Sequence, residues 1–252
     1  MICSNWTVED FNISYLKSRD DVKFIFGLDF GYQTSYNAFV AAAIEPMTRT
    51  IWIYSEMYEK GLTNLSIAKK ITSMGFSKEP IWADAAEPKS IYELQNGLIE
   101  ETTVFDRKEY VRYMLPNIRP AMKGPDSVSN GISKIQEFHM IVHPSCENMI
   151  LELNNYAWAK DKDGKLTGKP EKEWDHLCDA LRYAVTGELA YSHGGVVEAR
   201  GTDISGEGQK QTEPVSTLSA GPEITPAEQV VEVPQTSLRK RVCRVFSSIR
   251  SD

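Results

Sequence analysis

Three aspartates that lie far apart in the chain have the type and setting needed for metal-ion chemistry. Asp29 sits within an apolar run that begins at residue 23, where a lone carboxylate is costly unless it is paired or binds a cation. Asp84 ends a short apolar run ahead of a helix, a position where open α/β sheets often place ligand residues. Asp179 lies on the polar stripe of a late helical segment.

Carboxylate oxygens are the ligands that Mg²⁺ and Mn²⁺ prefer. Two such ions, about 3.5–4 Å apart, can activate a water molecule and stabilise the leaving oxygen of a phosphodiester. In that arrangement Asp29 would bridge both ions, while Asp84 and Asp179 would each hold one. The structural alternatives are a carboxylate that only accepts hydrogen bonds at a strand end, for Asp29, and a solvated helix face, for Asp179.

The residues around these acids refine the hypothesis. Strand alternation places Gly27 and Gly31 on the same face as Asp29, so we expect their missing side chains to leave room for an ion and a substrate phosphate. His176 lies one turn from Asp179 and could carry a proton or orient that acid, unless it is a surface histidine. Glu87 is better explained as a helix cap than as a metal ligand.

Candidate contacts to a nucleic-acid backbone are fewer. Lys123 precedes an expected helix N-terminus, which favours anions, although it could also be a solvated lysine. We group Lys89 and Ser127 with it as expected DNA contacts. The net charge of −7 opposes nucleic-acid binding globally but permits a local basic groove. No phosphate-binding loop of the Walker type occurs in the sequence.

The elements that must position these residues follow from hydrophobic periodicity. Strands are expected at 23–31, 37–44 and 50–59, as an antiparallel meander, and at 80–84, 118–122 and 138–142; helices are expected at 64–74, 87–97, 127–135, 145–156 and 174–189, with a hairpin turn at 160–165. This order predicts an α/β domain with a central mixed β-sheet flanked by helices.

The chain divides by composition into three parts. Residues 1–22 are polar and mixed, which suggests a linker or an edge element, and residues 23–191 form the expected domain. Residues 192–252 are poor in large apolar side chains, so we expect a disordered tail, whose basic end is either solvated or a docking peptide. The four cysteines form no C-x-x-C pair, and no apolar run is long enough to cross a membrane, so we expect a cytoplasmic protein without a membrane partner.

Four segments resemble, in order, the motifs of the C-terminal nuclease domain of phage terminase large subunits: FGLDFG at 26–31, WADAAEPKSI at 82–91, KGPDSVSNGI at 123–132 and DHLCDALRY at 175–183. The resemblance covers residues 5–189. It implies a ribonuclease H-like fold and a two-metal endonuclease that cuts concatemeric double-stranded DNA during genome packaging. By motif position, Asp29, Asp84 and Asp179 would bind two Mg²⁺ or Mn²⁺ ions, with His176 near the site.

The resemblance also implies partners: a terminase ATPase domain or subunit, the small terminase and the portal, in the cytoplasm of a bacterial host that carries the phage or prophage. Residues 5–11 look like the join to an ATPase domain, yet the sequence offers neither a phosphate-binding loop nor room for that domain. We therefore expect a split subunit, a separated gene product or a fragment that does not hydrolyse ATP alone. Two alternatives stay open: another ribonuclease H-like nuclease or resolvase, and a non-catalytic assembly module.

Overall fold

The computed structural model describes residues 1–32, 34–122 and 124–192, which belong to one compact unit. The expected tail therefore lies outside the described residues, apart from its first position, and so does Lys123. Among the described residues, no helix combines the length and the apolar character that crossing a bilayer requires.

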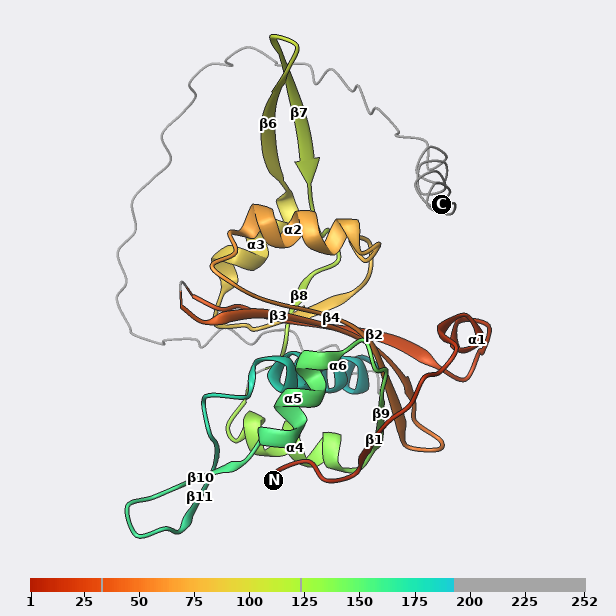
Figure 1. The fold of residues 1–252 in the computed structure, drawn as a ribbon, viewed down its shortest axis with the longest axis vertical. Helices are drawn as coiled ribbons and strands as arrows, with labels where there is room; N and C mark the ends of the chain where they lie inside the picture. The colour runs from red at the N-terminus through yellow and green to blue at the C-terminus, as the bar shows by residue number, and fades with distance from the viewer. Residues whose placement is uncertain (33, 123, 193–252) are drawn as a thin grey trace, which may run out of the picture. The chain divides into compact units, whose positions relative to one another are not determined.

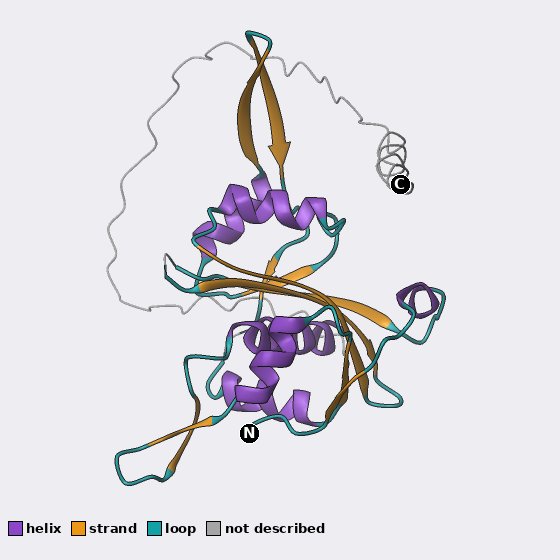
Figure 2. Ribbon diagram, in the orientation of Figure 1, coloured by secondary structure: helices purple, strands orange, loops and turns teal. Residues whose placement is uncertain are grey.

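A seven-stranded mixed sheet forms the centre of the unit, in the order β1-β9-β4-β3-β2-β5-β8 (Figure 2). Its strands are β1 (Trp6–Val8), β2 (Lys23–Asp29), β3 (Tyr36–Glu45), β4 (Thr50–Lys60), β5 (Ile81–Ala83), β8 (Arg119–Pro120) and β9 (His139–Val142). The expected meander is confirmed, because β2 pairs antiparallel with β3 and β3 with β4. The expected strand at 118–122 is reduced to two residues.

Helices cover both faces of the sheet (Figure 1). They are α1 (Ile13–Lys17), α2 (Asn64–Ser73), α3 (Pro88–Asn96), α4 (Ser127–Gln136), α5 (Glu147–Asn155) and α6 (His176–Ser192). One apolar core joins α4, α5 and α6 to one face, and a second joins α1, α2 and α3 to the other. Alternation along β2 assigns its residues to the two cores: Ile25 belongs to the first, and Phe26 and Leu28 to the second. Gly27 and Asp29 therefore face α6.

Two antiparallel hairpins stand apart from the sheet. β10 (Trp158–Lys160) and β11 (Leu166–Pro170) enclose the turn expected at 160–165. β6 (Leu98–Val104) and β7 (Arg107–Tyr113) form a longer hairpin that extends beyond α2 and α3 in Figure 1, and the sequence patterns did not predict it.

Candidate active site

The parallel pairing of β2 and β5 brings two of the expected acids to the same edge. Leu28 lies opposite Ala83, so Asp29 and Asp84 are the next residues of two neighbouring strands. The N–H of Asp84 donates to the carbonyl of Leu28 at 3.1 Å, which continues the ladder to the point where the strands separate. Neighbouring strands lie about 4.8 Å apart, so the two carboxylates leave adjacent positions at the carboxyl ends of the strands.

Asp29 takes part in a short chain of side-chain hydrogen bonds. Its Oδ2 lies 3.0 Å from Nδ1 of His176, and Nε2 of that ring lies 3.0 Å from the hydroxyl of Ser35. Both ring nitrogens are therefore engaged, which fixes the orientation of the imidazole. The expectation that His176 orients Asp179 is wrong in this structure, because the first turn of α6 directs the ring to β2.

The electrostatics of Asp29 show how closely the acids are gathered. Asp29 is 8% exposed, and burial raises the pKa of its carboxyl group to about 6. The hydrogen bond from His176 opposes this shift, while the charges of Asp179 and Asp84 raise the pKa further. The charges of both other acids therefore act on Asp29, as expected of carboxylates that share one site.

Asp179 is held by the next turn of its own helix. The guanidinium of Arg182 approaches both carboxylate oxygens, with Nη2 2.8 Å from Oδ2 and Nε 3.2 Å from Oδ1. Arg182 is buried, and such a two-point contact fixes the orientation of the carboxylate and compensates its negative charge. Sequence reasoning did not single out Arg182 in this role, although its place three residues after Asp179 permits the pair.

Removing the charge of Arg182 should destabilise the domain strongly. Arg182→Met leaves the Asp179 carboxylate, only 22% exposed, without its partner, and we expect a loss of about 3 kcal/mol in the free energy of unfolding. Urea denaturation measures this loss. The double variant Arg182→Met with Asp179→Asn should recover most of it, because no uncompensated charge remains. Equal stability of the single and double variants would contradict this account.

The two glycines beside Asp29 do not leave room for a ligand, contrary to expectation. A Cβ added to Gly27 would lie 1.8 Å from the carbonyl oxygen of Ala180, so the backbone of α6 fills that space. A Cβ added to Gly31 would lie 2.3 Å from backbone atoms of Tyr36. Gly27 thus permits the close packing of α6 on β2 that brings Asp179 and His176 to Asp29.

A divalent cation fits this group of acids in its charge and oxygen donors. Among the described residues, no three His, Cys, Asp or Glu side chains are arranged tightly enough to enclose an ion as they stand. In this arrangement His176 contacts one oxygen of Asp29, and Arg182 contacts both oxygens of Asp179. A bound cation would have to replace part of these contacts while compensating the mutual repulsion of the three acids.

The remaining expected residues lie at the starts of α3 and α4. Glu87 is the residue before α3 but makes no side-chain capping bond to a backbone N–H. Lys89 lies in the first turn of α3, its side chain 87% exposed. Ser127 is the half-buried first residue of α4. Among the described residues, the side-chain partner of Asp29 is His176 and that of Asp179 is Arg182, so Lys89 and Ser127 are not brought to these two acids.

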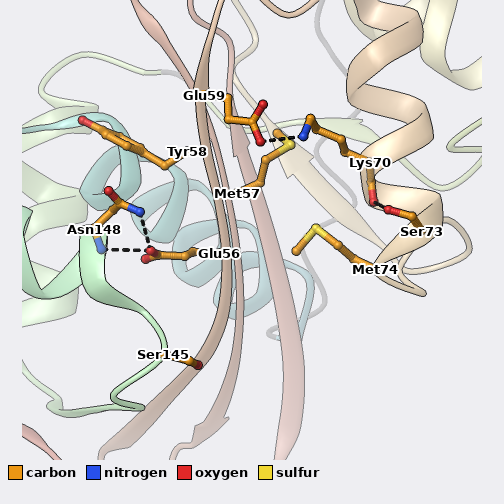
Figure 3. Close-up of a pocket in the computed structure, with 9 residues that line it drawn as sticks. All are labelled: Glu56, Met57, Tyr58, Glu59, Lys70, Ser73, Met74, Ser145 and Asn148. Atoms are coloured by element: carbon orange, nitrogen blue, oxygen red, sulfur yellow. Dashed lines mark hydrogen bonds and ion pairs between the residues drawn. The ribbon is translucent and has the colours of Figure 1, made fainter. Parts of the chain in front are cut away.

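Two pockets are lined by residues of the sheet and of its helices. One, of about 520 Å³, is lined by residues that follow Asp29 and Asp84 and by the start of α2: Phe30, Gly31, Tyr32, Asn37, Gly61, Leu62, Thr63, Asn64, Glu87 and Ser90. The other, of about 350 Å³, lies between β4, α2 and α5 (Figure 3). Its acids already have partners, since Glu56 accepts hydrogen bonds from Asn148 and Glu59 pairs with Lys70 at 2.5 Å.

Comparison with known protein families identifies the chain. A family model described as a terminase RNase H-like domain matches residues 29–187, a span that begins at Asp29 and includes Asp84, His176 and Asp179. The chain belongs to this family. The expected ribonuclease H-like fold and the resemblance to phage terminase large subunits are thereby confirmed.

Relatives of this terminase domain are found among phage proteins. The PBSX phage terminase large subunit of Bacillus subtilis (strain 168) is 32% identical over 160 residues, which are 63% of this chain and 33% of that protein. The terminase large subunit of Bacillus phage SPP1 is 28% identical over 160 residues, 63% of this chain and 34% of that protein. The chain thus spans about a third of the length of these curated relatives.

Solved structures agree with the fold of the terminase domain. The nuclease domain of the large terminase of bacteriophage SPP1, crystallised with bound Mn, superposes with a TM-score of 0.61 at 25% identity, over 73% of this chain and 97% of that one. The large terminase of a thermophilic bacteriophage superposes with a TM-score of 0.50 over 72% of this chain and 42% of that one. At 17% identity, this second likeness supports the fold alone.

Proposed function

We propose that this terminase domain is a metal-dependent endonuclease that cuts concatemeric phage DNA by two-metal phosphodiester hydrolysis. The observation that carries the proposal is the meeting of Asp29 and Asp84 on neighbouring strand ends, with the charge of Asp179 near enough to raise the pKa of Asp29. The SPP1 nuclease domain with bound Mn supports a divalent cation of this kind.

The residues have distinct proposed roles. The charges of Asp84 and Asp179 both raise the pKa of Asp29, so Asp29 is the acid suited to contact both ions. Asp84 and Asp179 would each hold one ion. Bound ions would supply an activated water and a stabilised leaving oxygen. His176 holds the Asp29 carboxylate in place through Nδ1 and is itself held by Ser35.

We propose that the substrate lies along the same edge of the sheet. The 520 Å³ pocket begins with the residues directly after Asp29, so it offers space for a DNA strand that passes the acids. Lys89 and Ser127, at the N-terminal ends of α3 and α4, remain proposed backbone contacts, because helix N-termini favour phosphate. Lys123 stays a sequence-based proposal for the same role.

A cleavage assay tests the proposal. Supercoiled plasmid incubated with the chain and Mn²⁺ should be nicked and linearised without ATP, and EDTA should stop the reaction. Linear duplex should be cut in preference to an RNA–DNA hybrid or a four-way junction. Preference for either of the latter would favour another ribonuclease H-like enzyme, and no nicking under any condition would favour the assembly module.

The proposed packaging role implies partners for this domain. We propose that the ATPase part of a terminase, the small terminase and the portal are the partners of this domain, in the cytoplasm of the bacterial host. Cleavage by this chain should not depend on ATP, because its sequence contains no Walker-type phosphate loop.

A further inference from the structure

A fully buried glutamate lies directly beneath the start of the helix that carries His176 and Asp179. Glu152, on α5, is 0% exposed. Its Oε2 accepts the backbone N–H of Leu177 at 2.8 Å and that of Cys178 at 3.0 Å. These donors belong to the first turn of α6, where N–H groups have no partner within the helix. Glu152 therefore does from another helix what a capping side chain does locally.

The place of these contacts matters for the site. Leu177 and Cys178 lie between His176 and Asp179, so the hydrogen bonds hold the very turn from which both side chains leave. Farther along, α6 is fixed differently, through the backbone contact of Ala180 with Gly27. The first turn of α6 is therefore held separately, by hydrogen bonds to the single carboxylate of Glu152.

A second contact of the same kind fixes α5 itself. Glu56, on β4, accepts the N–H of Asn148 at 2.9 Å, at the start of α5 (Figure 3). It also accepts the N–H of Met149 at 2.8 Å. The sheet thus holds α5 through Glu56, and α5 holds α6 through Glu152. The two contacts have the same chemistry, but only the second is made to a helix that carries residues of the candidate active site.

We propose that Glu152 is a positioning residue of the nuclease, which sets the first turn of α6 so that His176 and Asp179 meet Asp29 at the strand ends. This inference rests on the proposed function for its catalytic consequence. Rates are sensitive to such placement, because a displacement of about 1 Å at a reacting group can cost roughly a hundredfold.

The burial of Glu152 agrees with a dedicated role. Burial raises the pKa of its carboxyl group to about 7, and the hydrogen bond from Cys178 N–H is the largest influence in the opposite direction. A buried acid is costly to keep, and an apolar side chain would fill the space at a lower cost. The hydroxyl of Tyr58 also lowers this pKa, while both bonds to α6 depend on one oxygen, Oε2.

Two conservative variants separate the reach of Glu152 from its charge. Glu152→Gln keeps the chain length and an accepting oxygen, so we expect kcat for Mn²⁺-dependent plasmid cleavage within about threefold of wild type. Glu152→Asp keeps the charge but loses one methylene and the reach, so we expect kcat to fall at least tenfold with KM for DNA unchanged. Glu56→Asp is the matched control, which shortens the equivalent contact to α5 and should leave kcat within twofold.

Amide hydrogen exchange gives a readout that does not depend on activity. In Glu152→Asp the amides of Leu177 and Cys178 should exchange at least tenfold faster, while in Glu56→Asp the faster amides should be those of Asn148 and Met149. The proposal is overturned if Glu152→Asp keeps the wild-type kcat or the wild-type exchange, or if Glu56→Asp loses as much kcat. Wild-type protein that does not cleave would instead refute the proposed function, and the exchange comparison would still decide whether Glu152 holds α6.

Discussion

Asp29→Asn should lower kcat for Mn²⁺-dependent cleavage roughly a thousandfold, equivalent to about 4 kcal/mol in the barrier. The amide keeps the size and one oxygen of the carboxylate but loses the charge that is coupled to those of Asp84 and Asp179. In the proposed two-ion site Asp29 would contact both ions, and a neutral ligand there would weaken the binding of both, so the loss of kcat should exceed that caused by the same change at Asp84 or Asp179. Initial rates of plasmid nicking over a range of Mn²⁺ concentrations measure it.

The same substitution should not weaken the metal-free protein. The pKa of Asp29 in the folded state, about 6, lies above the ordinary value, so the folded state holds this proton more tightly than the unfolded state does. Stability contributed by the protonated form is therefore lost as the pH rises from about 4 to 6 and stays lost above it. At pH 8 in EDTA, Asp29→Asn should melt at or above the wild-type temperature.

An inactive but stable variant would separate chemistry from folding. Asp163→Asn, in the exposed turn between β10 and β11, is the matched control and should leave both the cleavage rate and the melting temperature unchanged. If Asp29→Asn cleaves plasmid at a rate close to wild type, the acids at this edge do not form the active site, whatever the family match.

The sequence was sufficient for the features that depend on local pattern. The continuous apolar run of β2 and the helical spacing of Leu177, Leu181 and Val185 report burial directly, and all three side chains lie in the core. The neighbourhood of Asp29 and Asp84 also follows once their strands are parallel neighbours, since both residues stand at carboxyl ends. The order of the elements along the chain was therefore enough to predict that Asp29 and Asp84 are neighbours.

The β6–β7 hairpin shows where pattern reading fails. Ile99 and Tyr110 are exposed by 64% and 61%, so the hairpin has no buried face to impose an alternating pattern. Its turn is formed by Phe105 and Asp106, both with positive φ, where Asn-Gly or Asp-Gly would have signalled a hairpin. Pairing between its own strands defines this element, and no property of single residues reveals it.

The partners of His176 and Asp179 could not be read from the chain either. Both residues share one helical turn, which suggested that they contact each other, but contacts across the helix surface depend on what packs against it. Here β2 offers Asp29 to His176, and Arg182 takes Asp179. The glycines misled for the same reason, because an absent side chain can admit a ligand or a neighbouring backbone, and only the packing decides which.

Gly27→Ala tests that packing and should be the most damaging single-methyl change in the sheet. The added Cβ would lie 1.8 Å from the carbonyl oxygen and 2.6 Å from the carbonyl carbon of Ala180, which are backbone atoms that cannot rotate away. Overpacking of a core commonly costs about 1–3 kcal/mol, and we expect about 3 kcal/mol or more here, because all of α6 must shift.

That shift should also lower the rate of cleavage, because the movement of α6 takes His176 and Asp179 away from Asp29. We expect kcat of the folded fraction to fall roughly a hundredfold, the effect of a displacement of about 1 Å at a reacting group. Gly124→Ala is the control, since a Cβ there meets no atom within 4 Å. Urea denaturation and cleavage at low temperature measure both effects. A Gly27→Ala protein with wild-type stability would mean that α6 does not pack its backbone on β2, and the acids would then lose the contact that brings them together.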